Sequence, residues 1–382
     1  MQRNKGFLLG DLRISICALI LVIFGSLMIA SAEMGTAVGN TAYLSSVITR
    51  QLIYAVIGII AYFLLMHLKV YRFPIFLYYL VYVVLLIMLL ACRLFGQING
   101  AYAWIQLGAG ATIQPSEFAK VFMIGFGARL FAKDNPEKNI SHFWTFAGLS
   151  ILYAFVIVFI QHDFGSGIVL AMICYCILLV PSYKEIKTHQ NWMILIILVV
   201  VALALIVLSP PVTELLKKHS DNYMIGRFLA AADPFLYQYD NGYHIIMSLV
   251  SFANGGLFGL GYGNSIHKYM NFPNPSNDFI LPVIVEELGI IGFVLFIIVY
   301  LLMLYPIVMG SLKSKIYSSK MVFLGVSLYF VVHFILNVGG VSGLIPLTGV
   351  PLLMISSGGS SLMACLSSLG LAQGEIARNI EN

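Results

Sequence analysis

Three carboxylates cluster around one long apolar stretch of this sequence. In the run SNDFILPVIVEELGIIG, Asp278 stands at the start, and Glu286 and Glu287 follow inside it. Ionisable groups at membrane depth are costly, so acids in such a stretch mark a functional site by default. Asp278 also has a structural alternative, because Ser276, Asn277 and Asp278 are all good helix N-cap residues. We therefore take Asp278 as the first candidate for chemistry, with capping as its alternative.

The two glutamates are expected to do different things. In a helix they lie roughly 12–14 Å beyond Asp278 and about 100° apart around the axis. Both cannot then face one groove, so one of them is expected to be structural.

Glu117 and Lys120 stand three residues apart at the start of another apolar run, where they can pair on one helix face. They form either a self-neutralising structural pair or a phosphate site in which Glu117 holds Lys120. Asp163 ends the sequence Gln161-His162-Asp163 and is either an interfacial cap or one wall of a site.

A further group of polar residues lies in the segment 210–278. Arg227 and Asp233 could form a plain salt bridge beside a turn, but arginine also suits bidentate contact with phosphate. His244 is near them in sequence, whereas we expect His67, His189 and His333 to be packing or interfacial residues.

The composition identifies the elements that must position these groups. The chain is 60% hydrophobic and 10% charged, with a mean hydropathy of +0.94, against roughly 25% charged residues in a soluble domain. This predicts an all-α polytopic membrane protein with a single domain over residues 1–382. Ten apolar runs approach the length of about 20 residues that spans a bilayer: 12–32, 51–69, 75–95, 117–132, 143–161, 165–182, 191–209, 279–305, 320–340 and 352–373.

Lysine and arginine predict the orientation, because short cytoplasmic loops retain positive charge. With both termini inside, fourteen of the 21 basic residues fall inside and seven outside, and four of those seven lie in the long 210–278 segment. The informative ratio is therefore fourteen to three, which predicts that both termini are cytoplasmic. The net charge of +5 mostly reflects this bias, and it does not suggest a nucleic-acid partner.

Two outer segments are long enough to carry function. Residues 96–116 hold Trp104 between glycine-rich turns and end with Pro115 and Ser116, a good helix start. Residues 210–278 lie between the seventh and eighth spans. They are predicted to contain interfacial helices, including an amphipathic piece around Val212–His219. Their glycine-dense run GGLFGLGYG follows no predicted strand, so a tight turn packed against the membrane surface is favoured over a phosphate loop.

The five cysteines all fall in apolar runs without metal-ligand spacing, so neither a disulfide framework nor a zinc site is predicted. We predict no protein-bound metal site. No cofactor is certain, and a divalent cation, Mg²⁺ or Mn²⁺, is one option.

Five ordered motifs resemble the SEDS family of FtsW, RodA and SpoVE over nearly the whole chain. They are NGAYAWIQLG with IQPSEFAK, QHDFGSG, the series from Arg227 through Asp233-Pro234 to Gly242-Tyr243, SNDFILPVIVEELGIIGF, and NVGGVSGLIPLTGVPLLMISSGGSSLMA. The segments QLIYAVIGIIAYFLLMHL and NGGLFGLGYGNSIHKY look closer to the FtsW/SpoVE branch.

The resemblance implies a peptidoglycan glycosyltransferase that polymerises lipid II at the outer face of the bacterial cytoplasmic membrane. It also implies a class B penicillin-binding protein as partner, undecaprenyl diphosphate-linked glycan, and a place among divisome or elongasome proteins. The essential carboxylate of the family corresponds to Asp278. The remaining candidates for substrate binding are Trp104, Glu117, Lys120, Asp163, Arg227, Asp233, His244, Ser248, Glu286, Glu287 and Ser360.

The chain departs from the family pattern at four positions and in one further motif, where QHDFGSG replaces a QPDLGT-like sequence. Ala103 stands where arginine usually precedes the tryptophan, Asn274 and Ser276 replace an acid and a histidine, and Ser357 replaces a tyrosine. These departures leave open a catalytically weak scaffold for the penicillin-binding protein. A lipid II flippase with a buried polar path is the other alternative.

For the enzyme we expect an inverting single displacement with Asp278 as general base. We also expect an outer cleft between Asp278 and Lys120 or Arg227 that is open sideways to lipid.

Overall fold

The computed structural model describes residues 10–38, 40–69, 72–98, 100–108, 111–132, 136–181, 184–207, 212, 223–239, 241–270 and 274–381. Ten helices of these residues correspond to the ten predicted runs: α1 (Leu12–Glu33), α2 (Thr41–His67), α3 (Ile75–Ala91), α4 (Pro115–Leu130), α5 (Pro136–Phe155), α6 (Phe164–Leu178), α7 (Lys184–Val207), α11 (Ile280–Lys313), α12 (Tyr317–Val341) and α13 (Gly359–Glu381). Within the described part of the chain, six helical segments are long and apolar enough to cross a membrane. The protein is thus an all-α polytopic membrane protein.

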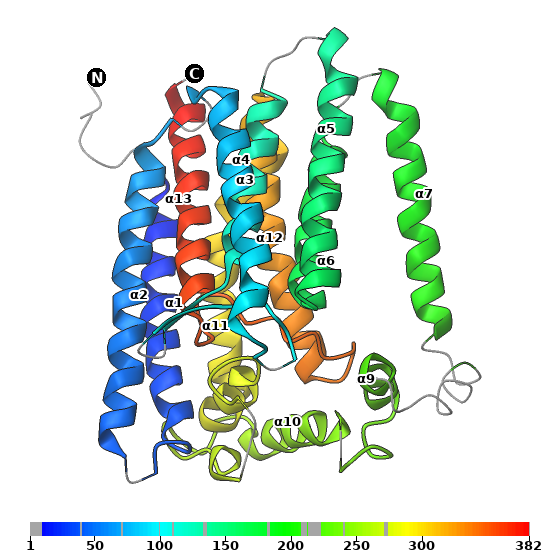
Figure 1. Ribbon diagram of the computed structural model, residues 1–382. Coiled ribbons are helices and arrows are strands. Elements are labelled where there is room, and N and C mark those ends of the chain that lie inside the picture. Colours follow the sequence, from blue (N-terminus) through cyan, green and yellow to red (C-terminus); the bar gives the residue numbers. More distant parts are fainter. Residues whose placement is uncertain are drawn as a thin grey trace, which may run out of the picture.

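The spanning helices stand side by side, and α1 begins at the end of the bundle where α13 finishes (Figure 1). This agrees with an even number of spans; the cytoplasmic location of that end stays a prediction. At the opposite end, α9 (Tyr223–Ala232) and α10 (Asn241–Gly255) lie across the bundle. Helix α7 packs against α5 at one edge.

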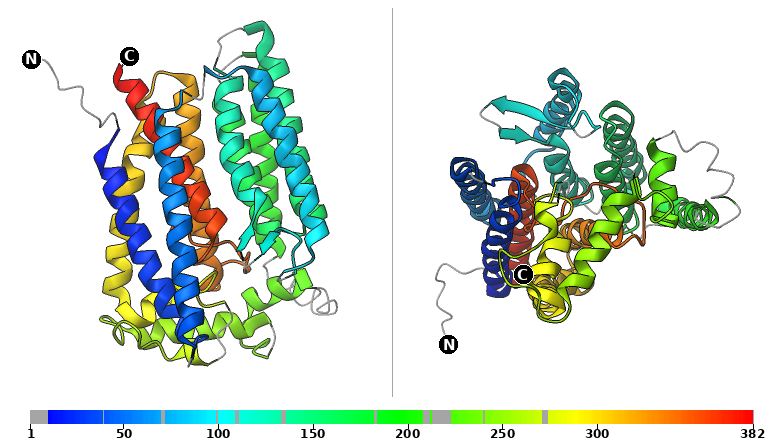
Figure 2. Two further views of the ribbon diagram at one scale, coloured as in Figure 1. Left: turned by 60° about the vertical axis from the view of Figure 1, so that its left-hand side comes forward. Right: turned by 90° about the horizontal axis from the view of Figure 1, so that it is seen from below.

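Helices α2 and α13 pack together along their length (Figure 2). Glycines make this approach possible: a Cβ at Gly370 would meet the carbonyl of Tyr62, and one at Gly359 would meet the ring of Tyr54. Small residues at such contacts let the backbones of membrane helices come close.

The two outer segments hold short elements. Residues 96–116 contain an antiparallel hairpin that the sequence did not predict, formed by β1 (Ile105–Gly108) and β2 (Ala111–Ile113) with Ile105 opposite Ile113. The 210–278 segment contains α9, α10 and a 3₁₀ turn, His267–Tyr269, so helices are confirmed there. Their position at a membrane interface stays a prediction, and the amphipathic piece expected at 212–219 falls, beyond Val212, outside the described residues.

Several predicted boundaries are wrong, and two of them have a clear physical reason. The helix expected from residue 51 begins ten residues earlier, at Thr41. The prediction missed these first turns because they contain polar residues and do not form an apolar run. The run expected at 352–373 is helical only from Gly359, since the residues just before form a buried, irregular segment in which Met354 has φ 67°.

Helix α11 is interrupted at Gly289, which adopts φ 68° and ψ −173°. The run GGLFGLGYG packs into the interruption. The N–H groups of Leu260 and Gly261 donate to the carbonyls of Glu286 and Glu287, at 2.9 Å each, and the carbonyls of residues 256 and 257 accept from residues 290 and 291. Unpaired backbone groups are expensive inside a membrane protein. The tight turn predicted from the glycines is therefore confirmed, although its packing partner is α11.

Candidate functional site

Asp278 lies in a turn directly before α11 and is partly buried. The N-cap position of α11 is occupied by Phe279, and no side chain caps the helix. The alternative that Asp278 is a simple helix cap is therefore wrong.

A buried asparagine fixes the backbone of Asp278. The side-chain amide of Asn337 donates to the carbonyl of Asp278 and to that of Val350, both at 2.9 Å. This joins Asp278 to the segment 347–351, where Gly349 has φ 71° and a Cβ would lie 3.7 Å from Asp278 Oδ2. Glycine tolerates this conformation, and its bare Cα leaves space beside the carboxylate.

The same segment brings two more candidates to Asp278. Arg227, on α9, donates from its guanidinium to the carbonyl of Leu347 at 3.0 Å. Asp163 precedes Gly165, which packs against the carbonyl of Thr348. The structure thus gathers three residues that lie far apart in sequence around residues 347–351.

Burial, followed by two nearby charges, sets the pKa of Asp278. Burial raises the pKa of Asp278 to about 7; the Arg227 guanidinium opposes this and Asp163 adds to it. Desolvation disfavours the charged form of a carboxyl group, and a neighbouring anion does the same. A carboxyl group with a pKa near neutrality suits proton transfer at ordinary pH.

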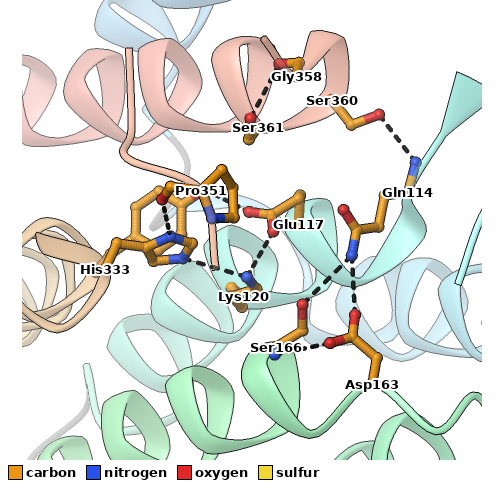
Figure 3. Close-up of polar contacts among 11 residues, drawn as sticks. Gln114, Glu117, Lys120, Asp163, Ser166, His333, Pro351, Gly358, Ser360 and Ser361 are labelled. Atoms are coloured by element: carbon orange, nitrogen blue, oxygen red, sulfur yellow. Dashed lines mark hydrogen bonds and ion pairs between the residues drawn. The ribbon is translucent and has the colours of Figure 1, made fainter. Parts of the chain in front are cut away.

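Asp163 also belongs to a hydrogen-bonded chain (Figure 3). Its carboxylate caps α6 by accepting from the N–H of Ser166 at 3.0 Å, and it accepts from the Gln114 amide at 2.9 Å. The N–H of Gln114 in turn donates to Ser360 Oγ at 2.9 Å. The capping alternative for Asp163 is confirmed. Gln114, which we did not single out, links Asp163 to the start of α13.

Lys120 lies in a sealed polar cluster (Figure 3). Its ammonium group is 2.7 Å from Glu117 and 3.3 Å from His333 Nε2, and Tyr329 donates to the other oxygen of Glu117 at 2.8 Å. His333 Nδ1 lies 3.2 Å from the carbonyl of Pro351. The distance of 2.7 Å between Lys120 Nζ and Glu117 Oε1 confirms the predicted pairing, and both side chains are 0% exposed. In this conformation a phosphate cannot reach the ammonium, and phosphate binding by Lys120 stays a prediction.

The residues of α12 at this cluster could have been found from their spacing in the sequence. Tyr329, His333 and Asn337 are spaced by four residues, which places them on one face of α12. We had assigned His333 to packing, but it connects the Lys120 pair to the segment beside Asp278.

Glu117→Ala and Lys120→Ala are each expected to destabilise the protein, because each leaves the other charge buried. The double variant should lose less free energy of unfolding than the sum of the two, by about 0.5–3 kcal/mol for residues in one network. Unfolding of the purified protein in detergent measures the three values. Strictly additive losses would show that the two side chains act separately.

Glu286 and Glu287 belong to a second buried network. Glu286 accepts from Ser265 Oγ at 2.5 Å and contacts His267 Nδ1 at 2.6 Å, while Glu287 lies 2.8 Å from the ammonium of Lys268. The N–H of Ser265 also reaches Glu287, at 3.3 Å. A structural role was expected for one of the two glutamates, and the segment 265–268 engages both; substrate contact by either stays a prediction.

The other candidates have local roles in this structure. Trp104 is partly buried before β1, and exposed Asp233 accepts from the N–H of Leu236 in a turn. Ser248 donates to the carbonyl of His244 within α10, and the ring of His244 lies 5.7 Å from that of Phe279. His244 thus lies beside Phe279, the residue after Asp278, and substrate contacts by all four stay predictions.

Known proteins resemble this chain over most of its length. A family model described as cell cycle protein, FtsW/RodA/SpoVE, matches residues 11–379. The chain belongs to this family. A probable peptidoglycan glycosyltransferase FtsW from Bacillus subtilis is 33% identical over 91% of this chain and 86% of its own length. Stage V sporulation protein E from the same organism is 32% identical over 94% and 95%.

Solved structures share the fold of this FtsW/RodA/SpoVE member. A chain solved in work on the structural coordination of polymerization and crosslinking by a peptidoglycan synthase complex is 24% identical and aligns with a TM-score of 0.74, covering 98% of this chain and 100% of its own. The rod shape determining protein RodA of Thermus thermophilus is 21% identical and aligns with a TM-score of 0.63, covering 97% of each chain.

Two departures from the family pattern are in contact. The N–H of Ser357 donates to the carbonyl of Ser276 at 2.7 Å, and Ser276 Oγ donates to Glu33 at 2.5 Å. The backbone of Ser357 and the side chain of Ser276 therefore belong to one local arrangement that ties the turn carrying Asp278 to α1. At a third departure, Ala103, the side chain is fully buried.

The cavities among the described residues include two that we consider. One of about 210 Å³ lies among the ends of α2, α4 and α13, and one of about 250 Å³ lies beside Met34, Leu44 and Tyr269. Neither is lined by Asp278, so the expected outer cleft is not one of these two cavities, and it stays a prediction. No three His, Cys, Asp or Glu side chains gather as metal ligands in the described part of the chain.

Proposed function

We propose that this chain is a peptidoglycan glycosyltransferase that polymerises lipid II at the outer face of the bacterial cytoplasmic membrane. Family membership and curated relatives named probable peptidoglycan glycosyltransferases support the activity. The observation that carries the mechanism is Asp278, with a pKa raised to about 7 and Arg227 among the groups acting on it.

The proposed reaction is a single displacement. The 4-hydroxyl of an acceptor N-acetylglucosamine attacks the anomeric carbon of the donor N-acetylmuramic acid, and Asp278 takes the hydroxyl proton as the new C–O bond forms. The bond to the undecaprenyl diphosphate breaks, and its electron pair leaves with the diphosphate. One displacement inverts the centre and gives a β-linkage from an α-linked donor.

The leaving diphosphate needs cationic contacts. Arg227 is the best-placed candidate, because its guanidinium contacts residue 347 next to Asp278 and presents a fork suited to phosphate oxygens. A divalent ion here would take most of its ligands from the diphosphate and water, as Mg²⁺ commonly does at such sites. Asp163 is the further carboxylate that could contribute.

The substrate tails are proposed to remain in lipid. Removing a prenyl chain from the bilayer costs about 0.8 kcal/mol per CH₂ group, so only the head groups would meet at Asp278. This places donor and acceptor at the bundle end crossed by α9 and α10, next to the bilayer.

A class B penicillin-binding protein is the proposed partner, within the divisome or elongasome. Support comes from the solved chain whose published description concerns a peptidoglycan synthase complex that coordinates polymerization and crosslinking. The partner would cross-link the strands that this chain makes.

The rate of polymerisation is expected to rise about tenfold between pH 6 and pH 8. A base must be ionised to accept a proton, and a carboxyl group with a pKa near 7 is mostly protonated at pH 6 and mostly ionised at pH 8. Initial rates with purified protein and lipid II measure the profile. Arg227→Gln should move its midpoint upward, because the guanidinium lowers the pKa of Asp278; a flat profile over this range would contradict the assignment of the base.

Purified protein with lipid II, with and without the penicillin-binding protein, tests the proposed function. A polymerase lengthens glycan, a flippase moves lipid II across vesicle membranes without lengthening it, and a scaffold does neither but raises the partner's activity. A continuous polar path for a flippase is not supported, since in the described residues no hydrogen bond joins the Lys120 cluster to the Glu286 and Glu287 network.

A further inference from the structure

The cavity of about 210 Å³ lies at the bundle end remote from Asp278. It is bounded by the final turns of α2, α4 and α13, with His67, Arg129 and Arg378 at those helix ends and Lys69 just beyond α2. A single water needs far less space. The charge distribution predicts that this end is cytoplasmic.

The lining carries excess positive charge. Lys69, Arg129 and Arg378 contribute three positive charges and Glu375 one negative charge, so the net value is +2 with His67 neutral. Glu375 is already engaged, because its Oε2 accepts from Ser319 Oγ at 2.5 Å and from Arg378 at 3.2 Å. The excess therefore rests on Lys69 and Arg129.

Two general effects explain basic residues at this end but not their convergence. Cations complement the negative ends of helix dipoles, and cytoplasmic segments retain lysine and arginine. Neither effect requires the cations to border one cavity. Arg129 is moreover held in place by donating Nε–H to the carbonyl of Phe73 at 2.8 Å. That bond uses one of its five donors, and the planar fork suits two phosphate oxygens.

The cavity also adjoins an apolar helix surface. Leu65, Val322 and Leu371 contribute to its lining, and on α2 and just after it Leu64 and Leu68 are 57% and 37% exposed. In a membrane-spanning bundle such exposed leucines face acyl chains. A ligand that fits both parts has an anionic head and an apolar tail.

We propose that this cavity binds the phosphate headgroup of an anionic phospholipid of the inner leaflet. Lys69 and Arg129 contact the phosphate, and an acyl chain lies along the surface of α2 at Leu64 and Leu68. Basic pockets between membrane helices on the cytoplasmic side are suited to such lipids. The proposal is independent of the glycosyltransferase reaction.

The test is lipid binding to the delipidated full-length protein in detergent, followed by native mass spectrometry. Phosphatidylglycerol should bind more tightly than phosphatidylcholine. The double variant Lys69→Gln with Arg129→Gln should weaken phosphatidylglycerol binding about 30-fold, at about fivefold for each basic residue near a lipid phosphate. Lys69→Gln alone replaces an exposed side chain, so it should weaken binding about fivefold without lowering the unfolding temperature.

The matched control is Lys313→Gln with Lys315→Gln, which removes two exposed charges outside the cavity lining. This control should bind phosphatidylglycerol like the unchanged protein. The proposal is overturned if both double variants weaken binding equally, or if phosphatidylglycerol shows no preference over phosphatidylcholine. It is also overturned if soluble glycerol phosphate binds as tightly as the lipid with the same dependence on Lys69 and Arg129, since the ligand would then be a free phosphate compound.

Discussion

Asp278→Asn is expected to lower the rate of lipid II polymerisation by about 10²–10⁴, the usual contribution of a general base. The amide has nearly the same shape but cannot accept the hydroxyl proton of the acceptor sugar. The hydrogen bond from Asn337 uses the backbone carbonyl of residue 278, so the substitution leaves it intact. Gel analysis of the glycan product under initial-rate conditions measures the change.

The fold of this variant is expected to be unchanged. Because burial disfavours the ionised carboxylate, its removal should not lower the unfolding temperature. Glu185→Gln, at an exposed position in the first turn of α7, is a charge-matched control and should polymerise at the unchanged rate. An Asp278→Asn protein as active as this control would eliminate Asp278 as the base.

Lys268→Met is expected to destabilise the protein by about 3–5 kcal/mol, the usual loss when one partner of a buried ion pair is removed. The side chains of Lys268 and Glu287 are both 0% exposed, and the ammonium also donates to Ser31 at 3.0 Å. Without it, a carboxylate stays buried inside the bundle. Denaturant unfolding in detergent gives the free-energy difference.

The companion variant, Lys268→Met with Glu287→Gln, should recover most of that loss. The amide can still accept from Ser31 Oγ, which bonds to both carboxylate oxygens in the unchanged protein at 2.6 and 2.7 Å, but it brings no charge. If Lys268→Met alone costs less than about 1 kcal/mol, the pair is not a structural ion pair in the folded protein.

Each of the ten apolar runs corresponds to a helix of the described residues, but hydropathy did not predict all of the helix ends. The start of α2 at Thr41 is missed because a helix can continue beyond the apolar run, into residues such as Ser45, Ser46 and Arg50. The segment 352–358 was wrongly predicted to be helical because it is apolar. Its leucines and Met354 are buried, but a buried apolar segment need not be a helix.

The sequence predicted those residues of the candidate site that are charged and lie in or next to an apolar run. Asp278 and the Glu117–Lys120 pair stand out in the sequence because a charge in an apolar run is rare. Gln114 and Asn337 do not stand out, because the structural role of an uncharged polar residue depends on hydrogen-bond partners that are distant in sequence. Asn337 joins residues 278 and 350, and such a connection is visible only once α12 is packed.

The interruption of α11 also bears on how the chain is made. The backbone groups left open around Gly289 are satisfied by residues 256, 257, 260 and 261, which the ribosome synthesises before α11. When this helix enters the bilayer, its missing partner already exists on the predicted outer side, so the break can close without waiting for α12 or α13. A side chain at Gly259, where a Cβ would collide with the backbone of residues 287 and 288, would therefore act first as a defect of membrane insertion and only later as a defect of the mature enzyme.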